Sequence, residues 1–505
     1  MQHVEVRAGS YADSVTLMQV TAQAQTVAGV QAALVAMGTE LNLDLLAGLG
    51  LPAPGQAGPN DMLVAVAAED RAALESALAV IDNALSARPA EQAVGQAQQP
   101  PRTTLSAARR SGPGLALISV PGQHAFAEAA DALEAGCDVM IFSDNVPVEQ
   151  EIWLKDQAAE RGLLVLGPDC GTAIVGGVGL GFSHSVPAGR IGLVAASGTG
   201  AQQVICLLDA AGTGVSAVLG VGGRDLSAAV GGRSARAALA ALDADPGTEL
   251  IVLLSKPPAD HVAAGLRQYA AGLGTPVQFA LIGPGQPDLT AAAEAALAAL
   301  GTAVPTWKAW TPTEADGQHS GGALRGLFAG GTLCDEAMVI AVERLGAVYS
   351  NIPLRQEWEL DPATPAPTAA HVMIDFGDDK LTAGRPHPMI DQRLRLDRLV
   401  AEAADPDVAV ILLDVVLGHG AHPDPAAEFA PAITAALAGR ETGDLAVVVS
   451  LIGARSDPQG LAAQATALAT AGAHVFASNA QAARFAALLA GRQSVPSDEP
   501  IGGAE

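Results

Sequence analysis

Three segments of the chain place glycines beside groups that can bind an anion, and each follows an apolar run typical of a buried strand. The first is Ser197-Gly198-Thr199-Gly200, where the chain is expected to turn from a strand into a helix. Ser197 or Thr199 can cap this helix, and the free N–H groups of its first turn favour a phosphate. A glycine-rich turn without a ligand has the same spacing, so both interpretations stay open.

The second segment combines Gly222 and Gly223 with Arg224. Glycines let a ligand approach the backbone closely, and a guanidinium can hold a carboxylate or a phosphate with two hydrogen bonds. A contact between Arg224 and Asp225 inside the loop is the alternative interpretation.

The third segment is Gly418-His419-Gly420, with His422 two residues further on. Either histidine could act as an acid, a base or an electrophile, and Asp424 can cap a helix that starts at Pro425. Two histidines three residues apart also permit a metal ion, but no third ligand is visible, so no metal is expected. Structural histidines are the remaining alternative.

Further candidates lie where other apolar runs end, because ligands of open α/β sheets bind beyond the carboxyl ends of the strands. Gly331 and Thr332 open a predicted helix that contains Cys334, whose thiol is either activated by the helix or simply small and buried. Asp169 follows a run at 163–168 and is a candidate for substrate binding.

The elements that must position these residues form several domains. We expect a small α+β domain over 1–85 and a Gln-, Ala- and Pro-rich linker over 86–113. From 114 onward, short apolar runs alternate with helical segments, which is typical of parallel sheets covered on both faces. The boundaries of this part are predicted at 114–188, 189–318 and 319–505.

Composition narrows the possible partners. The chain has 505 residues and a formal net charge of −26, which repels nucleic acid and anionic membranes and leaves a small molecule as the expected partner. None of the four lysines follows a glycine, so a Walker A loop is excluded. Four scattered cysteines indicate reduced thiols, and the N-terminus has no signal-peptide pattern, so a cytoplasmic protein without a membrane span is expected.

Residues 115–300 resemble the α subunit of succinyl-CoA synthetase, and residues 323–490 resemble the C-terminal domain of its β subunit. The first match rests on ISVPG, GPDCGTAI, GRIGLVAASGTGAQQV, GVGGRDL and DADPGTELIVLLS, and the second on GLFAGGTLCDEAM, VMIDFGDDK, VAVILLDVVLGHGAHPD and AVVVSLIGARSD. This order, behind a separate N-terminal domain, resembles the FdrA family. The resemblance implies a Rossmann-like domain of the CoA-binding type and two flavodoxin-like domains.

The chain departs from the synthetase in the parts that use ATP and CoA. No histidine follows LIGPG (281–285), where the resemblance places a phosphohistidine loop, and no ATP-grasp region lies between the two matching parts. Tight binding of ATP or CoA is therefore not expected, and no cofactor is predicted. The phosphate cradle remains, with one helix start at Ser197–Thr199 and another at Gly418–Asp424.

The resemblance to FdrA-type proteins implies a subunit of an oxamate carbamoyltransferase of allantoin breakdown, active on carbamoyl phosphate and working with partner subunits or as a homo-oligomer. In that reading the cradle binds phosphate, Arg224 binds a carboxylate, and His419 or His422 acts as acid, base or electrophile. An acyl-CoA synthetase is the alternative enzyme. A non-catalytic subunit that binds a phosphorylated metabolite is the second alternative.

Overall fold

The computed structural model describes residues 1–12, 14–52, 54, 57–86, 101–312, 321–362, 369–382, 385–441 and 443–491. The chain divides into two compact units. The first contains Met1–Cys170 and the segment Asp379–Asp391, which includes the short helix α12 (Asp379–Thr382). The second contains Gly171–Asp378 and the chain from Gln392 onward.

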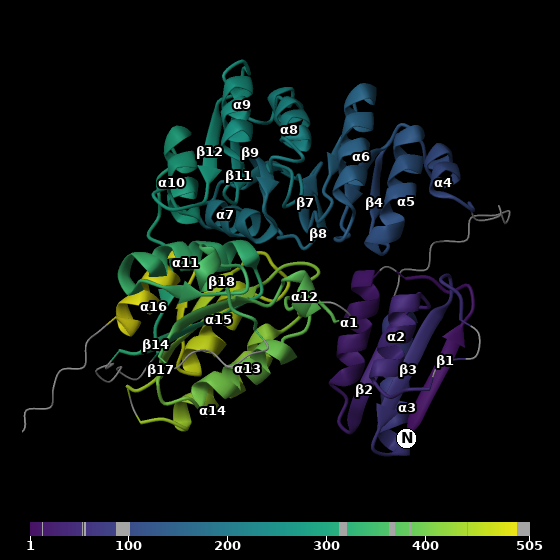
Figure 1. Ribbon diagram of the computed structural model, residues 1–505, viewed down its shortest axis with the longest axis vertical. Helices are drawn as coiled ribbons and strands as arrows, with labels where there is room; N and C mark the ends of the chain where they lie inside the picture. Colours follow the sequence, from purple (N-terminus) through teal and green to yellow (C-terminus); the bar gives the residue numbers. More distant parts are fainter. Residues whose placement is uncertain are drawn as a thin grey trace, which may run out of the picture. The chain divides into compact units, whose positions relative to one another are not determined.

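The N-terminal domain is an antiparallel sheet with helices on both faces (Figure 1). Its strands β1 (Gln2–Arg7), β3 (Met62–Ala68) and β2 (Val30–Met37) pair in that order. Helices α1 (Ser14–Gln25) and α3 (Arg71–Ser86) bury Leu17, Val20 and Ile81 against one face. Helix α2 (Glu40–Gly48) packs Leu46 on the other face, against Ala65 and Ala67.

The rest of the first unit holds a short parallel sheet of β4 (Leu115–Ile118), β5 (Asp138–Ile141) and β6 (Val165–Leu166). Helices α5 (Gly122–Glu134) and α6 (Val148–Arg161) cover it with small and branched apolar side chains. The expected linker contains helix α4 (Thr104–Ser111), which the sequence interpretation missed. This helix forms because Thr103 and Ser106 make a reciprocal capping box.

The first sheet of the second unit has six strands. In order across the sheet they are β12 (Val277–Leu281), β11 (Leu250–Ser255), β9 (Ala188–Ala196), β10 (Val215–Gly220), β7 (Thr172–Val175) and β8 (Val178–Gly181). The helices that follow its strands are α7 (Gly198–Ala210), α8 (Arg233–Asp243), α9 (Asp260–Ala270) and α10 (Leu289–Ala299). The four strands from β9 to β12 are parallel, whereas the β7–β8 hairpin joins β10 antiparallel, so 172–181 belongs to this sheet although the predicted boundary lies at 188.

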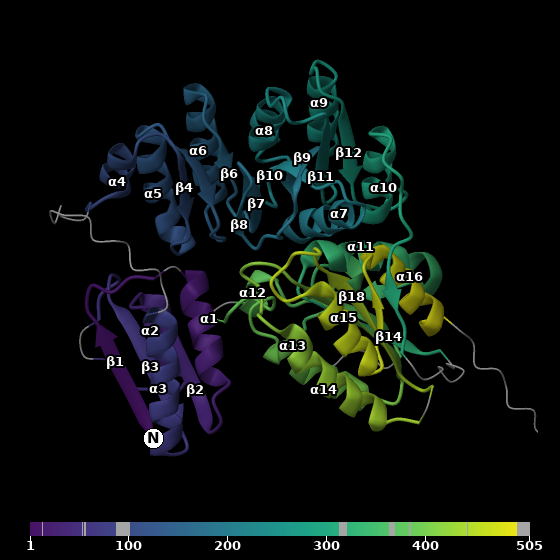
Figure 2. The same ribbon diagram turned by 180° about the vertical axis from the view of Figure 1, so that it is seen from behind.

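The second sheet of this unit has seven strands. Their order is β13 (Ala309–Trp310), β19 (His474–Phe476), β18 (Ala446–Ile452), β17 (Val408–Val416), β14 (Ala323–Phe328), β16 (His371–Asp375) and β15 (Val348–Tyr349), all parallel except β13. Its helices are α11 (Gly331–Leu345), α13 (Arg393–Ala403), α14 (Pro425–Ala438), α15 (Leu461–Thr470) and α16 (Asn479–Ala490), with a short 3-10 helix at Gln356–Trp358. Figures 1 and 2 show α7 of the first sheet lying against α11 of the second.

The fold class is confirmed as α/β, with parallel sheets behind a small N-terminal α+β domain. The central strands are apolar on both faces because helices cover both faces; β17 and β18 are buried at every position. In the parts of the chain that the structure describes, no helix combines the length and the apolar character that crossing a bilayer requires. A cytoplasmic location stays a prediction.

Candidate functional site

The two sheets of the second unit meet where helices α7 and α11 begin. Ser197 caps α7 as predicted, because the Gly200 N–H donates to its hydroxyl at 3.1 Å. The Ser197 hydroxyl donates in turn to Thr332 Oγ1 at 2.7 Å. A Cβ atom on Gly330 would lie 2.7 Å from Thr199, so the two helix starts are in direct contact. The structure thus brings the first predicted turn together with Thr332.

Lys256 and Asp375 lie beside Gly331 at this junction, and Asp335 pairs with Lys256; these three charged side chains are here called the Lys256 cluster. Lys256 follows β11 of one sheet, and Asp375 ends β16 of the other. The Lys256 ammonium pairs with Asp335 at 3.1 Å. A Cβ atom on Gly331 would lie 2.5 Å from Asp375 Oδ2 and 3.1 Å from Lys256 Nζ. Only a glycine leaves room for both groups.

The cluster is partly open to solvent, because the Lys256 side chain is 39% exposed while Asp375 is 6% exposed. Burial raises the pKa of Asp375 to about 7, against the opposing charge of Lys256. Burial opposes the charge of Lys256, but the carboxylates of Asp335 and Asp375 hold its pKa above the ordinary value. The site therefore offers a persistent cation next to a carboxyl group that changes charge near neutral pH.

Asp414, at the carboxyl-end half of β17, fixes the loop in front of α11. Its two oxygens accept hydrogen bonds from the N–H groups of Ala329 and Gly330, at 2.7 and 2.9 Å. Arg395 pairs with it at 3.1 Å, and both side chains are fully buried. Gly330 has no side chain to cap α11, so the first turn of this helix faces the cluster without a side-chain cap. The activated thiol considered for Cys334 is wrong, because complete burial raises its pKa well above the ordinary value.

The turn at 418–424 has most of its polar groups engaged within the chain. Gln459 accepts from the Gly418 N–H at 3.0 Å, and the His419 N–H donates to the Ser183 carbonyl at 2.7 Å. Asp424 caps α14 as expected, and Gln464 accepts from the Ala426 N–H at 2.8 Å. Phosphate binding by Gly418 and Gly420 stays a prediction.

The two histidines of this turn also have partners. His419 Nε2 lies 2.9 Å from the Ser185 hydroxyl, on an exposed part of the surface. His422 accepts from the Asp424 N–H at 3.1 Å and lies 3.4 Å from Glu428. Such contacts are typical of histidines that stabilise a turn. The catalytic role of His419 or His422 stays a prediction.

The loop with Gly222, Gly223 and Arg224 follows β10, and Arg224 is exposed. Asp225 is buried and accepts from the N–H groups of Ser234 and Ala235 at the start of α8, so the loop is held by its aspartate. Asp169 belongs to the first unit, where its N–H donates to the Ser143 carbonyl at 2.9 Å. Carboxylate binding by Arg224 and substrate binding by Asp169 stay predictions.

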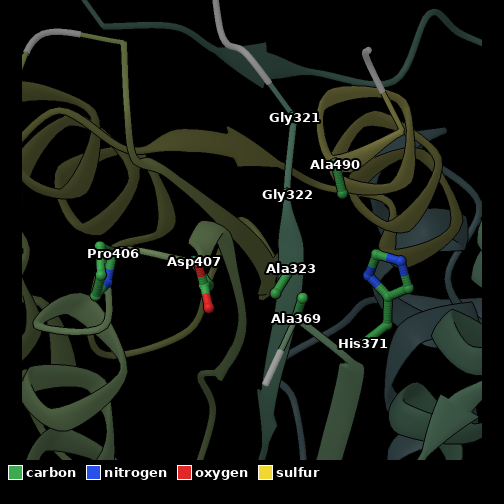
Figure 3. A pocket seen from close by; sticks show the side chains of 8 residues that line it. All are labelled: Gly321, Gly322, Ala323, Ala369, His371, Pro406, Asp407 and Ala490. Atoms are coloured by element: carbon green, nitrogen blue, oxygen red, sulfur yellow. The ribbon is translucent and has the colours of Figure 1, made fainter. Parts of the chain in front are cut away.

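An open hollow of about 390 Å³ lies at the opposite end of the seven-stranded sheet (Figure 3). His371 begins β16 and Asp407 precedes β17, so they flank the start of β14 between them. His371 Nδ1 already accepts from the Leu324 N–H at 3.1 Å. Because ligands of such sheets bind at the carboxyl ends of strands, the Lys256 cluster is the better candidate.

The sequence interpretation missed Lys256, Asp335, Asp375 and Asp414 as site residues. A signal was present, because Lys256 follows the run LIVLLS and Asp375 ends the run HVMID. The rule that ligands bind beyond the carboxyl ends of strands would have selected both, had it been applied to strands without glycine-rich turns. Among the described residues, no group of His, Cys, Asp and Glu side chains could hold a metal ion.

Comparison with known proteins shows the family to which the chain belongs. The family model for CoA-ligase matches residues 327–489, and the model "AllF, heavy metal-associated domain" matches residues 1–101. YahF of Escherichia coli (strain K12) is 39% identical over 93% of this chain and 95% of its own length. The chain therefore belongs to the family of YahF, a succinyl-CoA synthetase-like family with an AllF-type N-terminal domain. The name FdrA stays a prediction.

More distant relatives match part of the chain. The α subunit of the ADP-forming succinate–CoA ligase of Aquifex aeolicus is 29% identical over 30% of this chain and 51% of its own length, so the match spans about half of that relative. The α subunit of malate–CoA ligase of Methylorubrum extorquens is 28% identical over 26% of this chain and 45% of its own. A dinucleotide forming acetyl-coenzyme A synthetase of Ca. Korarchaeum cryptofilum covers 75% of this chain and 83% of its own, with 17% identity and a TM-score of 0.27.

These matches correct the predicted function. The main expectation, a carbamoyltransferase of allantoin breakdown, is wrong, because the CoA-ligase model and the CoA-ligase relatives support the alternative enzyme class. The ATP-using parts of the synthetase are missing from this chain, but the CoA-ligase domain itself is present over residues 327–489.

The residues of the N-terminal domain do not fit a heavy metal. Soft metal ions prefer thiolate and imidazole ligands. Residues 1–101 contain no cysteine and a single histidine, His3, which lies 3.6 Å from Glu5. We therefore derive no step of the function from a metal in this domain.

Proposed function

We propose that the protein is an acid–thiol ligase of the CoA-ligase class, which joins a small carboxylic acid to coenzyme A. The observation that carries the proposal is that the Lys256 cluster lies at the carboxyl ends of strands from two sheets, and that two of its three side chains belong to the segment that matches the CoA-ligase model. Gly331, Asp335 and Asp375 belong to that segment, and Lys256 comes from the other sheet.

The chemistry of this class requires a site for anionic groups, since the acid and the phosphate are both anions. The Lys256 ammonium and the uncapped first turn of α11 supply positive charge at one place. Ser197, Thr199 and Thr332 hold the two helix starts together there. In this proposal Gly198, Gly200 and Gly331 keep the backbone close to the anion.

The relatives suggest that the activity involves more than one chain. The matching succinate and malate ligases are named as α subunits, and this chain spans about half of each. We therefore propose a partner subunit that supplies the nucleotide-using part, in keeping with the predicted hetero-oligomer. Such a partner would also remove the need for an ATP-grasp region in this chain.

The proposal is tested by incubating the full chain with ATP, CoA and a panel of acids (acetate, succinate, malate and citrate), alone and with the products of neighbouring genes. Loss of free CoA thiol together with release of ADP and phosphate is the expected result for at least one acid. Saturable CoA binding without any thioester, in the presence of every candidate partner, would instead favour the non-catalytic subunit.

A further inference from the structure

We propose that Asp375 carries the phosphoryl group of the reaction as an aspartyl phosphate. This inference rests on the proposed ligase function, because a ligase that releases ADP and phosphate must hold the phosphoryl group on the acid or on the protein. The segment after Gly285, where the synthetase resemblance places a phosphohistidine, has no histidine through Gly301. The starting point is therefore which other nucleophile lies at an anion site.

The Asp375 carboxylate has one oxygen that accepts a hydrogen bond and a second oxygen that accepts none among the described residues. Oδ1 accepts a hydrogen bond from the Gly377 N–H at 2.9 Å. Among the residues that the structure describes, no hydrogen bond to Oδ2 is found, and this oxygen points at Gly331. The strand end is fixed on its other side by Asn351, whose amide bonds both the N–H and the carbonyl of Asp375, at 3.0 and 2.9 Å.

Positive charge converges on this free oxygen from two sources. Lys256 Nζ approaches Gly331 from the neighbouring sheet and pairs with Asp335, which leaves it beside Asp375 without a direct ion pair to it. The first turn of α11, without a side-chain cap, begins at Gly331 itself. Both can neutralise the equatorial oxygens of a phosphoryl group in transfer.

The other carboxylates nearby are less suited to accept the group. Asp414 is fully buried, uses both oxygens for N–H groups and pairs with Arg395. Asp335 is committed to Lys256. Of these three carboxylates, Asp375 is the one that forms no ion pair among the described residues, and its Oδ2 accepts no hydrogen bond there.

The step balances without a proton. Asp375 Oδ2 attacks the terminal phosphorus of a nucleoside triphosphate, the bond from phosphorus to the bridging oxygen breaks, and its electron pair leaves with the diphosphate. The carboxylate of the acid then attacks the same phosphorus and releases Asp375, which yields an acyl phosphate. The CoA thiol attacks the acyl carbon, phosphate departs, and the thiol proton passes to solvent.

The test is to incubate the full chain, with its partner where one is needed, with ATP labelled in the γ-phosphate, and to treat the denatured protein with hydroxylamine. Hydroxylamine cleaves an acyl phosphate, and strong base also hydrolyses it, whereas phosphohistidine is stable in base, so loss of the label in base distinguishes the two. We expect up to one hydroxylamine-sensitive phosphoryl group per chain, and at least a tenfold loss of labelling in Asp375→Asn. Asp407→Asn, an exposed carboxylate at the far end of the sheet, is the matched control and should label normally.

Label on His419 or His422, or undiminished label in a folded Asp375→Asn, would overturn the inference. Thioester formation without any hydroxylamine-sensitive label would also overturn the inference while leaving the proposed ligase intact. The label must then be absent both with ATP and with acetyl phosphate as an alternative phosphoryl donor. Label on Asp375 with no thioester from any acid would support the inference and count against the ligase. Thermal unfolding of each variant establishes that it is folded.

Discussion

At the scale of single residues, the site depends on a lysine and an aspartate that lie on different sheets. Lys256 is one of only four lysines in the chain, and its pKa is held above the ordinary value by Asp335 and Asp375. Asp375 has a pKa of about 7 because it is buried. Each of the two can therefore be tested by a change that removes its charge and keeps its size.

Lys256→Met should abolish most of the activity, because methionine keeps an unbranched side chain only one atom shorter but removes the cation that the proposal assigns to binding the anionic substrate. We expect a fall in kcat/KM of at least about 100-fold, equivalent to ~2.7 kcal/mol, with little change in stability. Thioester formation measures the effect, and Lys308→Met, at an exposed position, is the control. Equal values of kcat/KM for the two variants would show that Lys256 has no role in substrate binding or catalysis.

Asp375→Asn should make the protein more stable at neutral and alkaline pH. The pKa of Asp375 in the folded protein, about 7, is above the ordinary carboxyl value of 3.8, so ionisation opposes folding as pH rises between these values. The amide cannot ionise, and we expect a gain of roughly 2 to 4 kcal/mol above about pH 7 that shrinks towards pH 4. Urea unfolding over this range measures it; a gain that does not vary with pH would contradict the burial of this carboxyl group.

At the scale of elements, the site is built from the starts of two helices that face each other. The Ser197 cap fixes α7, Asp414 fixes the loop before α11, and the hydroxyls of Ser197 and Thr332 join them. This arrangement uses glycines where any side chain would collide. A Cβ atom added to Gly330 would collide with Thr199, and a Cβ atom added to Gly331 would collide with the Asp375 carboxylate.

Gly331→Ala should disable the site without unfolding the protein. The added methyl group would lie 2.5 Å from Asp375 Oδ2, so the carboxylate and Lys256 must move apart. We expect at least a tenfold loss of kcat/KM and a loss of stability of about 1 to 3 kcal/mol. Gly439→Ala is the matched control, since its new Cβ atom would meet backbone oxygens no closer than 3.5 Å. Both are compared by thioester formation and thermal unfolding.

At the scale of the whole molecule, the two sheets of the second unit are joined by polar contacts, some of them buried, as well as by apolar packing. His184 Nδ1 and Asp457 Oδ2 lie 2.6 Å apart, and neither side chain is exposed. The Arg455 guanidinium donates hydrogen bonds to both carboxylate oxygens of Asp209. The Gln203 amide donates to the Ala477 carbonyl and accepts from the Asn479 N–H. These contacts keep Lys256 and Asp375 close together although their strands lie in different sheets.

Asp457→Asn should weaken this junction. Burial raises the pKa of Asp457, but His184 and the N–H groups of Ser185 and Ala454 outweigh burial and lower it below the ordinary value. The stability it contributes is therefore present above about pH 4 and lost as pH falls further. We expect a loss of roughly 3 kcal/mol near pH 7, and a smaller one near pH 3, in urea unfolding. An equal loss at both values would mean that the charge of Asp457 does not matter.

Much of the local structure of this protein follows from local patterns in its sequence, although helix α4 was not predicted. Apolar runs fixed the strands, because a strand covered on both faces must be apolar throughout, and Ser197 and Asp424 were identified as helix caps because their side chains bond N–H groups only three residues away. The tertiary structure decided which turns meet. Ser197 lies against Thr332, Lys256 lies beside Asp375, and the 172–181 hairpin joins the sheet of β10, since these contacts depend on packing between residues far apart in the chain, which no local pattern encodes.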